Sequence, residues 1–469
     1  MSGPQSPLLE HATRDLARFA AGLHYEDIPR EAVERIKYCV LDAIGCCLYG
    51  VTLPWTQHVQ AMVVEENAQP VASIFGSGCM TSIANAVLVN STAGHAFELD
   101  DIHKESIVHP GSLAMPVALA FAEAAGGARG RDIITGMAAG YEVGTRVGNA
   151  ATMSLFLRGF HPQGTSGAFV AAATAGRMLN LDALQMQHAL GIVGSQAGGL
   201  MAAQEGAMVK RLHSGRAAQS GVYSALLAKR GFTGITDVLE APYGGYLSSY
   251  SDKPDPQRLT AGLGTVWETL NVGYKPHASV TSIHTALDAL ADIMRDVKLK
   301  AGDIAEVDVG VSTMTHVHCA WEYKAQSVTA AQMNLYYGLA VIALDGMAFV
   351  EQFREGRLRD PQILAFIERV RAHIDSGIDG MGAEFRHAAR VVVKTRDGRA
   401  FEREILHRRG SPENPLEPED VEYKFREVTR SCLSPIRSDR VVQLCAELHK
   451  LDNIRELIAI LAAPTASRS

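Results

Sequence analysis

The chain has 469 residues, of which 47% are hydrophobic, 20% are charged and 6% are aromatic, a profile typical of soluble globular proteins. Its length exceeds that of one hydrophobic core and predicts two or three domains. The formal net charge of −7 and the pI near 6.2 argue against nucleic acid as the main partner. The seven cysteines are scattered, without a CxxC pair, which favours a reducing, cytoplasmic location over a disulfide framework.

The sequence predicts neither a signal peptide nor a membrane partner. The N-terminal segment has no basic stretch followed by an apolar core. The longest apolar run, near residues 113–125, is interrupted by Pro116 and Glu123, so it is too short to span a bilayer.

The first half of the chain is predicted to form buried helices. Apolar residues recur at helical spacing in residues 31–48 and 82–95. Pro116 suits a first helical turn, followed by a buried helix over residues 117–125. A later helix is expected to start near Arg216.

A glycine stripe marks one of these helices. In residues 132–148, Gly136, Gly140, Gly144 and Gly148 recur every fourth residue and fall on one helical face. Glycine inside a helix costs about 1 kcal/mol relative to alanine. We therefore expect another backbone to approach this face closely.

The pattern changes after the Pro- and charge-rich residues 252–258. Residues 304–311 alternate like a half-buried strand, and Asp397-Gly398 is a strong hairpin signal between two further strands. Helices are expected at residues 327–343, 360–373 and 419–462. The predicted fold is mainly α with an α+β insertion: an all-helical domain formed by residues 1–265 and 405–469, and a smaller α+β lid domain formed by residues 266–404.

The acidic loop, residues 95–112, is the most concentrated source of reactive side chains. It contains three histidines and four carboxylates: His95, His103, His109, Glu98, Asp100, Asp101 and Glu105. Three later segments again place His or Lys beside Gly, Pro or Ser: GFHPQGTSGA, MVKRLHSGRAA and YKPHASVTSIH. Catalytic side chains usually lie on loops held by a rigid scaffold, so these four segments predict a composite active site.

Each segment also has a simpler interpretation. The turn at His161 could receive a carboxylate on the amides of the helix that follows, or His161 could be a plain hydrogen-bonding residue. Lys210, Arg211 and His213 form a basic focus that could be an ordinary solvated turn. If buried, Lys210 could instead clamp a substrate carboxylate or serve as a proton donor. His277 and His284 could share a helix face, but HExxH is absent, so no metal site is predicted. The glycine cluster of residues 191–199 does not match GxGxxG after a strand, so no dinucleotide is predicted.

Taken together and in order, HAFELDD, SIVHPGS, GFHPQGTSGAF, MVKRLHSGRAAQSG, GFTGITDVLE, KPxxSxxxxH and GSPENPLEPEDVEYKF resemble the MmgE/PrpD family from end to end. That family includes 2-methylcitrate dehydratases, cis-aconitate decarboxylases and an iminodisuccinate epimerase. The resemblance implies a helical domain built from both chain ends, an inserted lid, a cleft between them, a homodimer and no cofactor.

The resemblance also implies roles for single residues. Asp100, Asp101 and His109 match the family's acidic loop, although Glu98 and Leu99 replace its first aspartate and its aromatic residue. His161 and Lys210 match the histidine and lysine that decarboxylase members are thought to use. Tyr337 matches a cleft tyrosine.

The lid motif departs most from the family pattern. Lys275 and His284 match it, but His277, Val280 and Thr281 replace an aromatic residue, a cysteine and an arginine. A bidentate carboxylate clamp is therefore missing at Thr281, which argues against 2-methylcitrate and other tricarboxylates. The predicted catalytic residues are His109, His161, Lys210, Asp100, Asp101 and Tyr337, and the predicted substrate-binding residues are His103, His213, His277, His284 and Lys275.

From these residues we expect a cofactor-independent lyase, of the dehydratase or decarboxylase type. It would act on a small carboxylic acid by proton transfer at the carbon next to a carboxylate. One alternative is an epimerase of a dicarboxylate. The other is a non-catalytic binding protein on the same fold.

Overall fold

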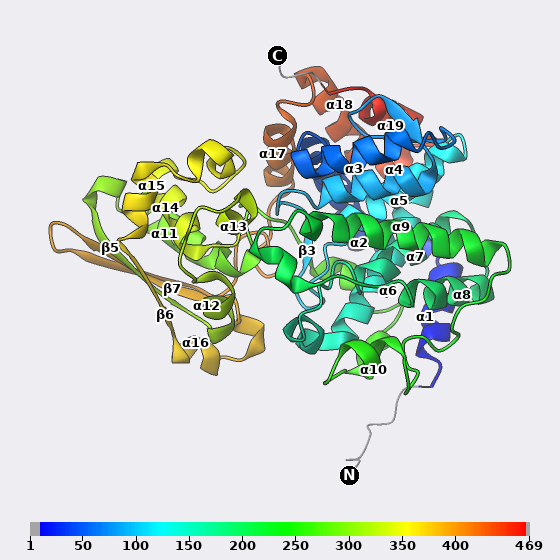
Figure 1. Ribbon diagram of the computed structural model, residues 1–469, viewed down its shortest axis with the longest axis horizontal. Helices are drawn as coiled ribbons and strands as arrows, with labels where there is room; N and C mark the ends of the chain where they lie inside the picture. Colours follow the sequence, from blue (N-terminus) through cyan, green and yellow to red (C-terminus); the bar gives the residue numbers. More distant parts are fainter. Residues whose placement is uncertain (1–9, 466–469) are drawn as a thin grey trace, which may run out of the picture.

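The structure, a computed structural model, describes residues 10–465. It is mainly helical with small sheets, as predicted. Two lobes are visible (Figure 1): a helical lobe formed by α1–α10 and α17–α19, and an α+β lobe formed by α11–α16 and a four-stranded sheet.

The helical lobe is built from long buried helices and two short strand pairs. Before the α+β lobe, its helices are α1 (Ala12–Gly22), α2 (Arg30–Gly50), α3 (Pro54–Glu65), α4 (Ile83–Gly94), α5 (Gly111–Ala124), α6 (Gly130–Leu157), α7 (Gly167–Met178), α8 (Ala183–Gly194), α9 (Val209–Lys229) and α10 (Tyr246–Tyr250). The short strands are β1 (Ala72–Ile74), β2 (Cys79–Thr81), β3 (Ile102–His103) and β4 (Val272–Gly273), which pair as β1–β2 and β3–β4.

Two segments, α7 and the acidic loop, pack closely against the glycine stripe of α6, as its spacing predicts. A Cβ at Gly144 would lie 2.8 Å from the backbone nitrogen of Val170 in α7, and one at Gly140 would lie 2.7 Å from the Val170 carbonyl oxygen. Further along, a Cβ at Gly148 would lie 3.0 Å from the carbonyl oxygen of Ser106, in the acidic loop. The stripe therefore brings both α7 and the acidic loop close to α6.

The C-terminal helices return to the helical lobe (Figure 1). They are α17 (Pro418–Thr429), α18 (Pro435–Ala446) and α19 (Arg455–Ala462). In α17, the buried Lys424 lies 2.6 Å from the carboxylate of Asp42 in α2 and donates to the carbonyl of Leu99 in the acidic loop at 2.5 Å. This ion pair joins the two ends of the chain beside the acidic loop.

The α+β lobe contains α11 (His284–Asp296), α12 (Thr313–Cys319), α13 (Val328–Gln332), α14 (Leu335–Asp345), α15 (Pro361–Ile367) and α16 (Ser376–Gly380). Its strands are β5 (Ile304–Val311), β6 (Val370–Ile374), β7 (Ala389–Thr395) and β8 (Ala400–Ile405), in the order β6–β5–β7–β8. Only β5 and β6 are parallel. The predicted strand at residues 304–311 and the hairpin at Asp397-Gly398 are confirmed.

Four helix predictions need correction. The helix expected at residues 327–343 is two helices, because the Asn334 side chain accepts a hydrogen bond from the Tyr337 amide and starts α14 anew. The helix expected at residues 360–373 ends at Ile367, and the next residues form β6, which pairs with β5. The helices expected at Val117 and near Arg216 begin earlier, at Gly111 and Val209.

The division into residues 1–265 with 405–469 and residues 266–404 stays a prediction. Most buried apolar residues up to Tyr274 belong to the core of the helical lobe, and most of those from Ala278 to Val393 belong to the second core. The second core also includes Cys46, Tyr49, Phe97 and Leu99 of the helical lobe. No single helix among residues 10–465 is both long and apolar enough to cross a membrane, although α2 and α3, bent by 83°, meet the length and composition criteria as a pair.

We expect Gly144→Ala to lower the free energy of unfolding by about 1–3 kcal/mol, because the added methyl group overpacks the contact with α7. Urea denaturation measures this change. Gly302→Ala is the matched control, since a Cβ there meets no atom within 4 Å. A Gly144→Ala protein at least as stable as the native one would contradict close packing at the stripe.

Candidate active site

A cavity of about 70 Å³ lies where the two lobes meet. We call it the pocket. Its lining residues fall in residues 98–109, 156–161 and 201–210 of the helical lobe, and in 275–282, 314–333 and 386–387 of the opposite side. All four of the segments that the sequence singled out therefore contribute to one site.

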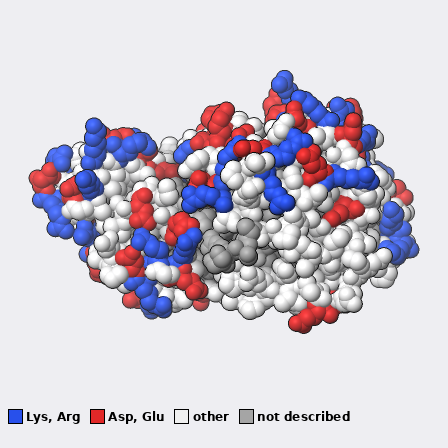
Figure 2. Space-filling view, turned by 90° about the horizontal axis from the view of Figure 1, so that it is seen from above, with Lys and Arg blue, Asp and Glu red and all other residues white. Residues whose placement is uncertain are grey.

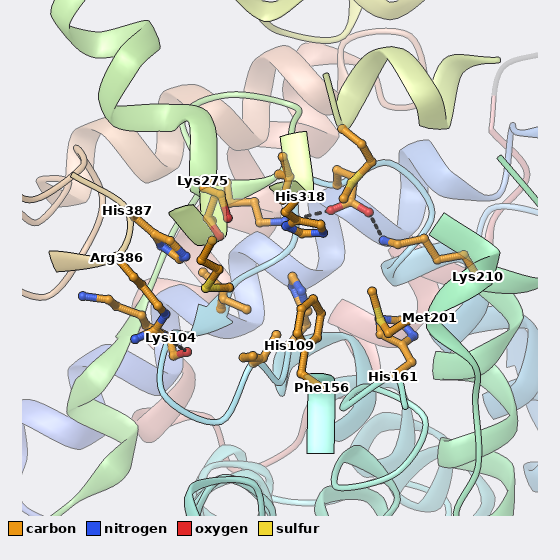
Figure 3. A pocket seen from close by; sticks show the side chains of 18 residues that line it. Lys104, His109, Phe156, His161, Met201, Lys210, Lys275, His318, Arg386 and His387 are labelled. Carbon is orange, nitrogen blue, oxygen red and sulfur yellow. Dashed lines mark hydrogen bonds and ion pairs between the residues drawn. The ribbon is translucent and has the colours of Figure 1, made fainter. Parts of the chain in front are cut away.

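The carboxylate of Glu98 gathers three buried cations. One of its oxygens, Oε1, pairs with Lys210 Nζ and lies 2.5 Å from Arg211 Nη1. The other, Oε2, lies 3.3 Å from Lys275 Nζ. Figure 3 shows Lys210 and Lys275 converging on this carboxylate from opposite sides. One negative charge thus faces three positive charges in a buried place, a deficit that an anionic ligand would reduce.

Glu98 is held in a costly backbone conformation. Its φ is 55°, in the left-handed region, which costs a non-glycine residue about 1–3 kcal/mol. Burial alone would raise its pKa, but Lys210, Lys275 and Arg211 hold that pKa well below its usual range. Glu98 therefore stays ionised and fixes the positions of Lys210 and Lys275.

Asp100 lies behind the pocket between two imidazoles. Its carboxylate oxygens lie 2.8 Å from His95 Nδ1 and 3.4 Å from His109 Nδ1. Burial alone would raise the pKa of Asp100, but His109 and His95 hold it well below its usual range. Since only His109 of these three lines the pocket, Asp100 and His95 can orient its ring but do not themselves reach a ligand there.

His161 and Lys210 both line the pocket, as predicted. His161 Nδ1 lies 2.9 Å from His213 Nδ1, so one ring donates and the other accepts. Burial, with Lys210 nearby, lowers the pKa of His161 well below 6.5 and that of His213 to about 4. Burial also lowers the pKa of Lys210 to about 8, although Glu98 acts in the opposite direction. At pH 7 the two histidines are therefore neutral and Lys210 is mostly charged.

Asp101 has a different position from Asp100. It accepts hydrogen bonds from the Gly111 amide at 2.9 Å and from the Tyr141 hydroxyl at 2.7 Å. A Cβ at Gly111 would lie 2.8 Å from the carboxylate, so glycine is needed for this approach. Asp101 anchors the start of α5 and does not line the pocket, which removes the geometric basis for its predicted catalytic role.

The structure does not bring Tyr337 to the pocket. Its hydroxyl donates to the carbonyl of Gln352 at 2.6 Å, and its ring packs against Tyr323 and Phe353 in the core of the α+β lobe. The Asn334 side chain caps the start of α14 three residues before Tyr337. This start determines which side chains of α14 face the core, and Tyr337 is one of them. The predicted cleft tyrosine is therefore a core residue.

Three predicted substrate-binding histidines also have structural partners outside the pocket. Both ring nitrogens of His103 are engaged, by Ser106 at 2.9 Å and Glu268 at 3.0 Å. His277 Nε2 lies 2.9 Å from Asp288 and lines a separate cavity of about 550 Å³. His284 Nε2 lies 3.1 Å from the Ser279 carbonyl. Of the predicted substrate-binding residues, Lys275 lines the pocket and His213 supports His161.

Sequence reasoning missed four polar residues that line the pocket: Lys104, His318, Arg386 and His387. Lys104 belongs to the acidic loop, whose acids and histidines were the predicted source of reactive side chains. Arg386-His387 stands just before β7, and a cation beside a histidine at the start of a strand was a usable signal. The sequence argument against tricarboxylates rested on Thr281 alone, and these cations weaken it.

The charge of the pocket differs from that of the protein surface. On the face shown in Figure 2, side chains of both signs are mixed over both lobes. Among the side chains that line the pocket, by contrast, four are Lys or Arg and only Glu98 is acidic. Buried positive charge of this kind focuses small anions from solution.

One group of residues offers atoms suited to a metal ion. His95, Asp100 and His109 place one possible ligand atom each within 4.8 Å of one another. The separations of 2.8 and 3.4 Å between the Asp100 oxygens and the ring nitrogens also fit direct pairing of a carboxylate with two imidazoles. That pairing gives each group a role without an ion, so the predicted absence of a metal stays our hypothesis.

The free energy of unfolding should depend on pH because Asp101 is buried. Burial, followed by the nearby Asp42, raises its pKa to about 8, against about 3.9 in the unfolded chain. Between these values the folded state binds the extra proton, so stability from this residue is lost as pH rises. We expect Asp101→Asn to gain free energy of unfolding relative to the native protein between pH 5 and 8, by up to about 1.4 kcal/mol per pH unit.

Chemical denaturation at several pH values measures this difference, and the exposed residue Asp397 supplies a matched control, Asp397→Asn. A difference between Asp101→Asn and the native protein that stays constant with pH would contradict a protonated, buried Asp101.

The chain matches two family models. Residues 14–259 match the MmgE/PrpD N-terminal domain, and residues 277–448 match the MmgE/PrpD C-terminal domain. The second match begins close to the change of core after Tyr274.

Curated relatives match over nearly the full chain. The chain is 30% identical to a cis-aconitate decarboxylase of Aspergillus terreus, over 97% of this chain and 96% of the relative. It is 28% identical to a cis-aconitate decarboxylase-like protein of Aspergillus oryzae, over 96% and 97% respectively. It is 25% identical to a cis-aconitate decarboxylase of Homo sapiens, over 98% and 96%.

Proposed function

Because the chain belongs to the MmgE/PrpD family, we propose that it is a lyase that decarboxylates a small polycarboxylic acid of the cis-aconitate class. The observation that carries this proposal is the pocket itself: Lys104, Lys210, Lys275 and Arg386 line it, against the single carboxylate of Glu98. A substrate with several carboxylates fits that charge. The relatives named as cis-aconitate decarboxylases support the reaction type.

The proposed reaction requires a site that holds the charged groups of the substrate in position and supplies one proton. In an unsaturated acid of this class, the bond to the departing carboxylate breaks and its electron pair forms a new double bond. The electrons of the old double bond then take a proton at the carbon next to a second carboxylate. One CO₂ leaves and one proton is consumed, so the site must stabilise transient negative charge and deliver a proton.

Lys210 is the proton donor in this proposal. It lines the pocket and is mostly protonated at pH 7, because its pKa is near 8. In this proposal, neutral His161, which is hydrogen-bonded to His213, orients the substrate and passes a proton back to Lys210. Lys275 holds the carboxylate on which negative charge gathers, since it stays close to Lys210 through Glu98.

His109 lines the pocket with its ring oriented by Asp100. This pair resembles the carboxylate–imidazole arrangement that fixes a catalytic histidine in position and tautomer. Because the walls come from both lobes, closing the lobes on a ligand would exclude water and strengthen these electrostatic contacts. No step needs a cofactor, and the homodimer expected from the resemblance stays a prediction that sedimentation can test.

Proton NMR in D₂O tests the proposed reaction. With cis-aconitate as the substrate, we expect a product that lacks one carboxyl group, carries one deuterium from solvent and appears together with released CO₂. Addition of water to the double bond would indicate a dehydratase run in reverse. Deuterium in recovered substrate without any product would indicate an isomerase. Either result, or silence, would refute decarboxylation of this substrate.

The matched variants are Lys210→Ala and His161→Ala, which we expect to lower turnover by at least about a hundredfold, as loss of a proton-transfer group does. His277→Ala is the control, because His277 lies outside the pocket, and it should keep near-native turnover. Near-native turnover in Lys210→Ala would rule out Lys210 as the proton donor.

A further inference from the structure

The pocket has two cationic ends, and the proposed mechanism assigns roles to the residues of only one. In Figure 3, Lys210 and His161 lie at one end, while Arg386, Lys104 and His387 lie together at the other. His109 and the apolar ring of Phe156 stand between them. The far end is assembled by both lobes, since Lys104 comes from the acidic loop and Arg386 from the turn before β7.

Arg386 is buried and rigidly held. Its side chain is 7% exposed. One terminal nitrogen, Nη1, donates to Glu105 Oε1 at 2.9 Å and to the Ala383 carbonyl at 3.1 Å. The other, Nη2, donates to the carbonyl of Lys104 at 2.8 Å. These bonds fix the plane of the guanidinium group at the wall of the pocket.

The remaining donor of Arg386 has no partner. Its Nε is buried and forms no hydrogen bond among the described residues. Buried donors are almost always satisfied, and an unsatisfied one on a charged group is expensive. The Nε–H of Arg386, on a fixed guanidinium group that lines the pocket, is therefore free to donate a hydrogen bond to an anionic ligand.

The neighbours of Arg386 suit the same ligand. His387 lines the pocket, and no hydrogen bond joins its ring to any described residue. Burial keeps the pKa of His387 well below 6.5, so its neutral ring can offer one N–H. Lys104 Nζ donates to the Glu384 carbonyl at 2.5 Å, which holds the ammonium group beside the site. Among residues 10–465, the only carboxylate hydrogen-bonded to these three side chains is that of Glu105, which accepts from Arg386 Nη1 and not from Nε.

We propose that Arg386 binds a second carboxylate of the substrate through its Nε–H, with His387 and Lys104 completing an anion subsite at the far end of the pocket. This inference rests on the proposed function, and it identifies the residues that determine which substrates the enzyme accepts. It also assigns a replacement for the clamp that the sequence lacks, because Val280, Thr281 and Ser282 line the pocket without a cation. The enzyme would therefore select acids that keep a carboxylate for the Arg386 end when the Lys210 and Lys275 end is already occupied.

Two non-reacting probes differ by one carboxylate and test the subsite directly. Tricarballylate becomes methylsuccinate when one terminal carboxyl group is replaced by hydrogen. By isothermal titration calorimetry, we expect the native protein to bind tricarballylate at least about tenfold more tightly than methylsuccinate. In Arg386→Gln, this ratio should fall to about twofold or less, while the affinity for methylsuccinate stays within about twofold of native.

A matched control separates recognition from support of the fold. Glu105→Gln removes the ion pair that holds Arg386 but keeps the guanidinium group, so it should retain most of the discrimination. Arg386→Lys keeps a cation within reach of Glu105 but lacks the Nε donor, so it should also lose the discrimination between the two probes. This variant provides the same test if Arg386→Gln does not fold. Retained discrimination in Arg386→Lys or Arg386→Gln would overturn the proposal, as would its equal loss in Glu105→Gln.

The binding test does not depend on whether the protein turns over a substrate. A native protein that discriminates between the probes but releases no CO₂ from cis-aconitate would refute the proposed reaction and leave the subsite intact. A native protein that turns over cis-aconitate but binds the two probes equally would refute the subsite and leave the reaction intact.

Discussion

The carboxylate of Glu98 and the three cations around it determine the character of the site. Lys210, Lys275 and Arg211 are all buried within reach of this one acid. Buried charges are tolerated only when they are paired, so without Glu98 the side chains of Lys210 and Lys275 would not keep their positions. With Glu98, three cations share one negative charge. That imbalance favours the binding of an anion, and the left-handed backbone at Glu98 is part of the arrangement that creates it.

The helical lobe serves this arrangement by close packing. The glycine stripe of α6 lets the acidic loop settle against the helix at Gly148, and the buried pair of Lys424 with Asp42 holds the other side of the loop through the Leu99 carbonyl. The loop is thus clamped by elements from the N-terminal and C-terminal parts of the chain. The α+β lobe contributes Lys275, His387 and Arg386 from beyond that clamp. A site shared in this way is complete only when the two lobes are in contact.

Local patterns in the sequence predicted the elements, and the four site segments, better than they predicted single roles. Alternation found β5 and the Asp397-Gly398 hairpin, and the glycine spacing predicted close packing on α6. The failures involve long-range contacts. Residues 370–374 form a strand because β5 offers them a partner, and Tyr337 enters the core because Asn334 restarts a helix. Asp100 and Asp101 are adjacent in sequence, but opposite partners direct one toward His109 and the other toward Tyr141. The Arg386-His387 pair was a usable signal, but nothing near it in sequence indicates that Arg386 meets Lys104 across the two lobes.

The most direct test of this account is the stability of Glu98→Gln at pH 7, measured by chemical denaturation with and without excess citrate as a small tricarboxylate. The account predicts a loss of about 3–5 kcal/mol without citrate, since one buried acid no longer compensates three cations. Citrate should then recover much of that loss and stabilise the variant more than it stabilises the native protein. Glu306→Gln, which removes an exposed ion pair with Lys394, should change little. A Glu98→Gln protein as stable as the native one without citrate would contradict the account.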